Sequence, residues 1–300
     1  MVAQRAWSLV RDTLVSFFND DALSRGAAVA YYTIFSIAPI LLIATAVAGL
    51  VFGYQAAQGA IVQQLTGIMG HGSASALQAL LEGARFKSTS IFATVAGVVT
   101  LGLTATGVFT ELQTALNIIW RATPEGSVTG TLLRARLLSL GLLAALGFLL
   151  LVSLIVSAGL TAISTYLSGR WAEAVPMLRD INAAASFVLI TVLFAAIYKV
   201  LPDCKIAWAD VAIGALVTSL LFVAGKFLIS LYISNSAFAS SYGSAGSLLV
   251  ILLWIYYSAQ IFLLGAEFTR VFADRRRAAN VRATPPSPQQ TTAPPPPTTN

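Results

Sequence analysis

The chain has 300 residues, of which 57% are hydrophobic and only 10% are charged. A soluble domain carries about 25% charged residues, so the composition excludes an ordinary soluble domain and predicts a chain whose main solvent is lipid. The formal net charge is +6, but the Lys and Arg residues flank the apolar stretches instead of forming one basic face. This distribution argues against a nucleic-acid partner. We predict an all-α, polytopic integral membrane protein with six transmembrane helices.

Residues 1–25 are predicted to form a cytoplasmic amphipathic helix that lies along the membrane interface. Apolar residues recur there at helical spacing, at Trp7, Val10, Leu14 and Phe17. Charged residues separate them, and this pattern is typical of a helix whose apolar face enters the interface while its polar face stays in water.

The first expected span covers residues 26–53, a stretch without charge that is long enough to cross roughly 30 Å of hydrocarbon. Pro39 stands near its middle. Since proline has no N–H, it should kink the helix and leave one carbonyl without its usual donor. Tyr32 and Ser36 precede Pro39 and are candidates to satisfy that carbonyl. A kink that only fits the neighbouring helices is the alternative.

Five further apolar stretches are predicted to span the membrane, at residues 88–110, 137–168, 181–198, 211–233 and 246–266. With the first span they make a six-helix membrane domain over residues 26–277. Residues 54–87 are of intermediate polarity and are interrupted by glycines, so they should form an external amphipathic region. Residues 278–300 are rich in Pro and Thr, cannot bury a core and are expected to be a disordered cytoplasmic tail.

The Lys and Arg residues predict the orientation of the chain. With six spans, thirteen of the eighteen fall on the side of the two termini and four on the other side, while Lys226 lies within a span. Since cytoplasmic loops carry the excess of positive charge, both termini are predicted to be cytoplasmic.

Four blocks of the sequence carry a resemblance to a known family: GAAVAYYTIFSIAPIL, LQTALNIIW, LPDCKIAWADVAIGA and YGSAGSLLVILLWIYYSAQIFLLGAEFTRVFA. Through them the chain resembles the YihY/virulence factor BrkB family of bacterial inner-membrane proteins, many of which have carried a ribonuclease BN label. The resemblance covers roughly residues 20–275. It implies a six-helix protein of the bacterial plasma membrane, and it brings no settled biochemical activity with it.

Ionisable residues within or at the edge of the spans are candidate site residues, because a charge in hydrocarbon is costly. They are Glu111, Lys226 and Glu267. Polar residues that share a helical stripe with Lys226 or Glu267 complete the candidate set: Ser219, Ser230, Tyr256 and Gln260. Such stripes predict a polar cavity between the helices. The alternative is that Lys226 snorkels outward, that Glu267 forms a surface pair, and that the polar groups only join neighbouring helices.

These patterns favour a transporter-like or lipid-handling protein that takes an anionic or amphipathic substrate and has membrane lipids as partners. A non-transporting envelope scaffold is the alternative, and a ribonuclease is a third. We expect no enzyme, no cofactor and no metal site, because Cys204 is the only cysteine, His71 the only histidine, and no cluster of carboxylates is apparent. Nothing in the sequence determines the oligomeric state or the substrate.

Overall fold

The computed structural model describes residues 2–53, 107–122, 174–235 and 244–283, together with residues 55, 56, 58–63, 66 and 78. All regular structure in these ranges is helical, and they contain no strand. The labelled helices are α1 (Val2–Asn19), α2 (Ala22–Phe52), α6 (Ala174–Val200), α7 (Trp208–Asn235) and α9 (Ser244–Ala283). A further helix covers residues 107–119. The all-α prediction is therefore confirmed for the part of the chain that the structure describes.

Three helices are long and apolar enough to cross a membrane, within the described ranges: Asp180–Val200, Trp208–Ile229 and Leu248–Asn280. They overlap the predicted fourth, fifth and sixth spans, which lie within α6, α7 and α9. The first predicted span lies within α2, which continues through Pro39 as one helix. The predicted third span, most of the second and most of the external region at 54–87 lie outside the described residues. The total of six transmembrane spans stays a prediction.

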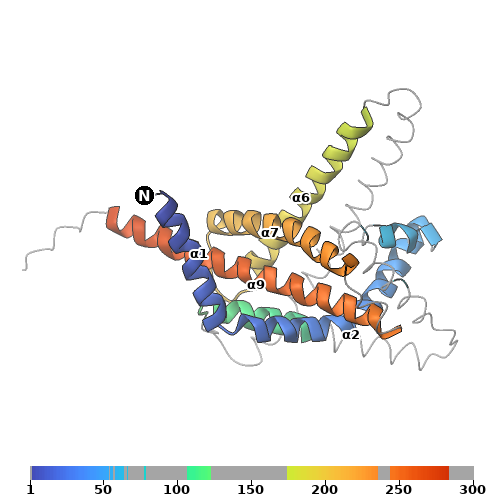
Figure 1. Ribbon diagram of the computed structural model, residues 1–300, viewed down its shortest axis with the longest axis horizontal. Coiled ribbons are helices and arrows are strands. Elements are labelled where there is room, and N and C mark those ends of the chain that lie inside the picture. The colour runs from blue at the N-terminus through green and yellow to red at the C-terminus, as the bar shows by residue number, and fades with distance from the viewer. Residues whose placement is uncertain are drawn as a thin grey trace, which may run out of the picture.

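Helix α9 is the centre of the described structure. It runs between α7 on one side and α2 on the other, and α1 crosses it near its C-terminal end (Figure 1). Its apolar side chains join one core with residues of α6, α7 and the helix at 107–119, including Leu116, Tyr198, Val211, Phe262 and Leu263. Because α9 packs against α1, α2 and α7, the position of each of these helices depends on its side chains.

Helices α7 and α9 approach closely because each presents a glycine to a threonine of the other. A Cβ atom on Gly214 would lie 1.9 Å from Thr269 Oγ1, and one on Gly265 would lie 2.0 Å from Thr218 Oγ1. Both threonines donate to a carbonyl of their own helix, Thr218 to Gly214 and Thr269 to Gly265. In lipid, where burial of apolar surface contributes little, such close packing of small residues holds helices together.

The chain turns sharply between α1 and α2. Asp21 has φ 53° and ψ 39°, in the left-handed region that Asp tolerates better than most residues. After the turn, α2 runs along α9. Arg275 of α9 holds α1 in place, because it donates to Ser8 and pairs with Asp12. The predicted N-terminal helix of residues 1–25 is thus α1 plus the turn and the first residues of α2.

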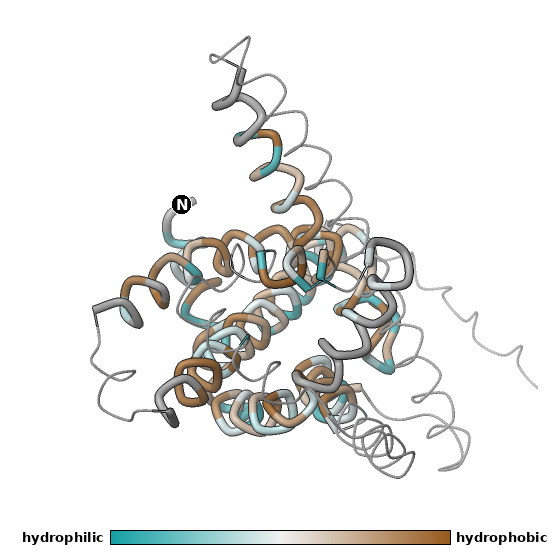
Figure 2. Tube along the Cα trace, turned by 90° about the vertical axis from the view of Figure 1, so that its right-hand side faces the viewer, coloured by the Kyte–Doolittle hydropathy of each residue, from teal (hydrophilic) through white to brown (hydrophobic). Residues whose placement is uncertain are grey.

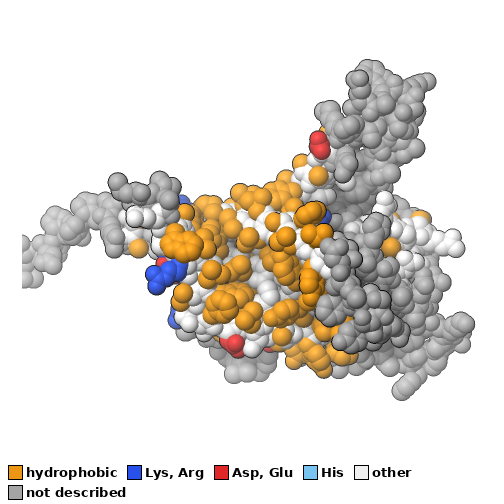
Figure 3. Space-filling view, viewed as in Figure 1, with side chains coloured by type: hydrophobic (Ala, Val, Ile, Leu, Met, Phe, Trp, Pro, Cys, Tyr) orange, Lys and Arg blue, Asp and Glu red, His pale blue; other side chains and the backbone are white. Residues whose placement is uncertain are grey.

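The surface of the described part is apolar along the helices and charged at one end. Hydrophobic side chains cover the middle of the face drawn in Figure 3, while Lys and Arg side chains gather near α1. The first half of α6 projects away from the other labelled helices (Figures 1 and 2). Helix α9 continues through Ala283, beyond residue 278, where the tail was predicted to begin. The residues Arg275–Ala283 include several good helix formers, which explains the extension.

Candidate functional site

Charged side chains from several helices lie together at one end of the described structure. This polar end comprises the α1–α2 turn, the end of the helix at 107–119, the α6–α7 loop and the last third of α9. Ion pairs join these elements: Arg25 with Glu111, Arg121 with Asp20, Arg270 with Glu267, and Arg276 with Asp210. Residues predicted from the charge distribution to share one side of the membrane thus lie at one end of the molecule.

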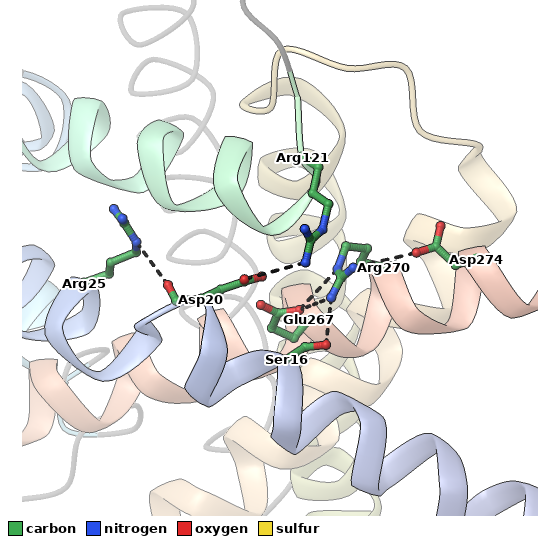
Figure 4. A network of polar contacts seen from close by, with 7 residues as sticks. All are labelled: Ser16, Asp20, Arg25, Arg121, Glu267, Arg270 and Asp274. Carbon is green, nitrogen blue, oxygen red and sulfur yellow. Dashed lines mark hydrogen bonds and ion pairs between the residues drawn. The ribbon is translucent and has the colours of Figure 1, made fainter.

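The centre of the polar end is the carboxyl group of Glu267. Its side chain is 0% exposed, and Oε2 accepts from Arg270 Nε and Nη2 at 3.3 and 3.2 Å. Arg270 Nη2 also donates to Ser16 Oγ at 2.8 Å. Figure 4 shows the carboxyl group of Asp20 beside that of Glu267. Glu267 therefore pairs with Arg270 in a buried position, not at the surface, and a second carboxyl group lies next to it.

Glu111 lies in the same polar end, half-buried, with its Oε1 3.7 Å from Arg25 Nη1. Sequence reasoning found Glu111 and Glu267 separately, and the structure brings them into one region through Arg25 and Asp20. The link is visible in Figure 4, where Arg25 Nε donates to the backbone carbonyl of Asp20 at 3.3 Å. The two candidates therefore belong to one polar network.

Lys226 lies elsewhere, on the wall of a shallow depression between α7 and α9. The depression has a volume of about 150 Å³, counting its open side, and is lined by Phe222, Lys226, Ile229, Trp254, Tyr257 and Ser258. Glu267 follows Tyr257 by ten residues on α9, which places it about 15 Å further along the helix. The structure therefore does not bring Lys226 and Glu267 together. The predicted polar cavity that would join them stays a prediction.

The other candidates on α7 and α9 mostly bond within the protein. Ser219 is buried and donates to the carbonyl of Ala215 on its own helix at 2.8 Å. Gln260 Nε2 donates to the carbonyl of Leu23 at 3.2 Å. Tyr256 is partly buried and packs against the small core cluster around Ala30 and Ile255. Ser230 lies on α7, and its side chain falls outside the described part.

The candidates on α2 lie along its contact with other helices. The ring of Tyr32 covers Gly107, where an added Cβ atom would lie 2.8 Å from Tyr32 Cδ1. Ser36 is fully buried and donates to the carbonyl of Thr33 at 3.1 Å. The kink predicted at Pro39 and the satisfaction of its freed carbonyl stay predictions, because the Pro39 ring falls outside the described side chains.

A second polar contact closes the α6–α7 loop and was not anticipated from the sequence. Asp203 accepts from Gln113 and from Asn117, whose Nδ2 lies 2.8 Å from Oδ2. Asn117 Oδ1 accepts in turn from the backbone N–H of Asp203 at 2.8 Å. Asp210, in the first turn of α7, is buried and pairs with Arg276 at 3.0 Å. These contacts fix the end of α6 and the start of α7.

Metal ligands are not grouped in the described part of the chain. No group of three or more His, Cys, Asp or Glu side chains is placed there to hold an ion. Cys204 lies in the α6–α7 loop, half-buried, and this burial raises the pKa of its thiol. A thiol with a raised pKa is a weak nucleophile and a poor ligand near neutral pH.

Comparison with known proteins agrees with this architecture. Residues 13–291 match the protein family described as Virulence factor BrkB. The chain belongs to this family. BrkB relatives include a UPF0761 membrane protein of Rhodospirillum centenum, 26% identical over 90% of this chain, and one of Alcanivorax borkumensis, 29% identical over 88%. A UPF0761 membrane protein of Cronobacter sakazakii is 31% identical over 64% of the chain.

The chain spans about three fifths of the length of these BrkB relatives, between 59% and 64%. No solved structure is significantly similar to it. The family resemblance seen in the four sequence blocks is confirmed, and with it a bacterial-type membrane protein. These comparisons do not show the activity, substrate or partners of this BrkB protein.

Sequence reasoning missed Asp20 and Asp203 as members of the polar end. Asp20 precedes the first span by several residues and carries no local signal beyond its neighbour Asp21. Asp203 follows Pro202 in the sequence LPDCK, a pair that favours a turn and gives no sign of a partner. Both residues are acidic and stand next to the basic end of a predicted span. This pattern alone does not indicate which residue each of them contacts.

Proposed function

We propose that this BrkB protein is a transporter-like or lipid-handling protein of the bacterial inner membrane that binds an anionic amphiphile at Lys226. The depression between α7 and α9 carries the proposal. It combines one cation with three aromatic side chains and the hydroxyl group of Ser258. Pockets that orient a ligand are mostly apolar, with a few placed polar groups, and this lining follows that rule.

The surroundings of the depression favour an amphiphile over a small polar solute. Beside Lys226 on α7, Phe227 and Leu228 are 71% and 60% exposed, so apolar surface continues from the depression along the helix. The depression is open to the surface and encloses no space large enough for a water molecule, so a ligand would lie along its lining side chains and not inside a cavity. An anionic group would contact Lys226 while its chain lies along α7.

The distribution of charge supports an orientation with the polar end in the cytoplasm. Arg25, Arg121, Lys199, Arg270, Arg275 and Arg276 all lie at that end. Trp208 is largely exposed there, and the Lys199 ammonium lies 5.3 Å from its ring centre. Exposed tryptophan beside basic residues is typical of a membrane–water boundary on the positive side. The depression at Lys226 would then lie toward the outer leaflet.

A non-transporting envelope scaffold is the second candidate, and one observation favours it. Several buried polar groups on the helices already have partners inside the protein. Tyr198 donates to the carbonyl of Phe262 at 2.7 Å and lies 3.1 Å from Thr218 Oγ1. Such bonds lock helices together without any need for a substrate.

Substitution of Lys226 separates the two candidates. Lys226→Met keeps the apolar stem and removes the charge, and Lys226→Gln keeps a hydrogen-bond donor. We expect both variants to bind an anionic phospholipid about tenfold more weakly, the equivalent of about 1.4 kcal/mol, with unchanged binding of a zwitterionic one. Native mass spectrometry of the full chain with each lipid measures this difference.

The matched control is Lys205→Met, which removes the same charge from an exposed position of the α6–α7 loop. It should leave the preference for the anionic lipid unchanged. All three variants should stay monodisperse in detergent. Undiminished binding of the anionic lipid by both Lys226 variants would contradict the proposed site and favour the scaffold.

A further inference from the structure

Two buried carboxyl oxygens at the polar end have no donor among the described residues. They are Asp20 Oδ2 and Glu267 Oε1. The two carboxyl groups lie side by side (Figure 4). A buried acceptor without a donor is costly, and two facing carboxylates add mutual repulsion to that cost.

The other oxygens of the two groups are accounted for. Glu267 Oε2 accepts from Arg270, and Asp20 Oδ1 lies 3.9 Å from Arg121 Nη2. The side chain of Arg121 is 71% exposed, so its long contact neutralises Asp20 only weakly. Among the described residues, Arg270 is the cation that bonds closely to this pair, through Glu267. Its guanidinium group also donates to Ser16.

The charges around the pair come from every described element that packs there. Arg270 and Asp274 face it from α9, with Asp274 3.8 Å from Arg270. Arg121 faces it from the end of the helix at 107–119, and Arg25 and Glu111 pair with each other on its α2 side. Counted together, Asp20, Glu267, Glu111 and Asp274 contribute four carboxylates against three guanidinium groups. One added proton balances the cluster.

We propose that Asp20 and Glu267 form a proton-binding site in which one proton is shared between Asp20 Oδ2 and Glu267 Oε1. The proton comes from water at the polar end, and it converts two facing acceptors into a donor and an acceptor. The inference goes beyond the proposed function and does not depend on it, because the site lies on other side chains than the depression at Lys226.

A shared proton also holds the α1–α2 turn against α9. Asp20 stands directly after α1, and its partner Glu267 stands on α9. When the proton leaves, two carboxylates compete for Arg270, which also bonds Ser16 of α1. Repulsion then acts on the contact between α1 and α9. The site therefore makes the docking of α1 depend on pH at this end of the molecule.

Infrared difference spectroscopy of the purified full chain tests the site, because a protonated carboxyl group absorbs separately from a carboxylate. The pH is raised from about 4, the ordinary range of a glutamate, to about 9. We expect wild-type protein to lose a carboxylic acid band well above the pH at which exposed carboxyl groups lose theirs. Glu267→Gln and Asp20→Asn should both lack that band, since either change removes one half of the pair.

Asp274→Asn is the matched control, because Asp274 belongs to the same cluster but its side chain is 56% exposed and pairs with Arg270. The control should keep the band. Loss of the band in the wild type at the ordinary pH, or its persistence in either pair variant, overturns the proposal.

Thermal unfolding of the same proteins gives a second measurement. Folded wild-type protein binds one proton more than the unfolded chain, so its stability should fall as the pH rises above about 4. In Glu267→Gln the carboxamide replaces the shared proton by a permanent donor, so this fall should be absent. Equal pH dependence of the unfolding temperature in the wild type and in Glu267→Gln would also overturn the proposal.

Discussion

At the scale of single residues, Gly265 decides how closely α7 approaches α9. Its missing side chain leaves room for Thr218 Oγ1, and the Tyr198 hydroxyl lies close by. Tyr198 and Thr218 are both fully buried, so neither can move away without leaving a polar group unpaired. A glycine at this position is required by the close approach.

We expect Gly265→Ala to lower the free energy of unfolding by about 1–3 kcal/mol, the range for an overpacked contact. The new methyl group would meet Thr218 at 2.0 Å and force α7 and α9 apart. Denaturation of the protein in detergent measures the change. Gly59→Ala is the matched control, because no described residue has an atom within 4 Å of a Cβ atom there. A Gly265→Ala protein as stable as the control would contradict the packing argument.

At the scale of elements, the connection between α6 and α7 is held from outside by the helix at 107–119. Asn117 both donates to the Asp203 carboxylate and accepts from the Asp203 backbone N–H. Such a two-way contact fixes the loop in one conformation. Cys204 follows directly in the chain, so the reactivity of its thiol reports on the loop.

Asn117→Ala should release the loop and speed the alkylation of Cys204, the only cysteine of the chain. In the wild type, burial raises the pKa of the thiol, so little thiolate is present near neutral pH and the reaction is slow. The rate should therefore rise with pH in the wild type and be higher at each pH in the variant. Mass spectrometry of the labelled protein follows both rates.

Thr114→Ala is the control for that experiment, since Thr114 is exposed and donates to the carbonyl of Thr110 on its own helix. Equal labelling rates in Asn117→Ala and in the wild type would show that the contact does not restrain the loop.

At the scale of the whole molecule, the polar end and the apolar helix surfaces predict how the protein sits in the bilayer. The α6–α7 loop belongs to the polar end, which should face the cytoplasm. Gln55, beyond the end of α2, is exposed and lies toward the opposite end. The two positions should therefore differ in access from outside the cell.

Single cysteines placed in a Cys204→Ser background test this orientation. We expect a membrane-impermeant thiol reagent to label Gln55→Cys on intact spheroplasts, and to label Lys205→Cys only after the membrane is opened. The reverse pattern would invert the predicted topology. Labelling of both positions in intact spheroplasts would place both ends outside.

Much of the architecture could be predicted from the sequence because hydrophobic length and charge are distributed along the chain itself. The apolar stretches at 181–198, 211–233 and 246–266 lie within α6, α7 and α9, and the basic residues that flank them meet at one end. Helix α9, whose uncharged run ends in a cluster of arginines, is also the helix that α1, α2 and α7 contact. These features depend on local composition, because a segment that crosses lipid must be apolar along its length and must satisfy its backbone hydrogen bonds as a helix.

Single charged residues in or near a span could be found in the same way, and this identified Glu111, Lys226 and Glu267. Their partners could not be found from spacing. Asp20 and Glu267 stand at opposite ends of the chain, and only the α1–α2 turn and its packing on α9 bring them together. Whether a polar stripe meets a cation, a carboxyl group or another helix depends on the register of helix packing. That register is set by close contacts such as Gly214 with Thr269, which the tertiary structure alone decides.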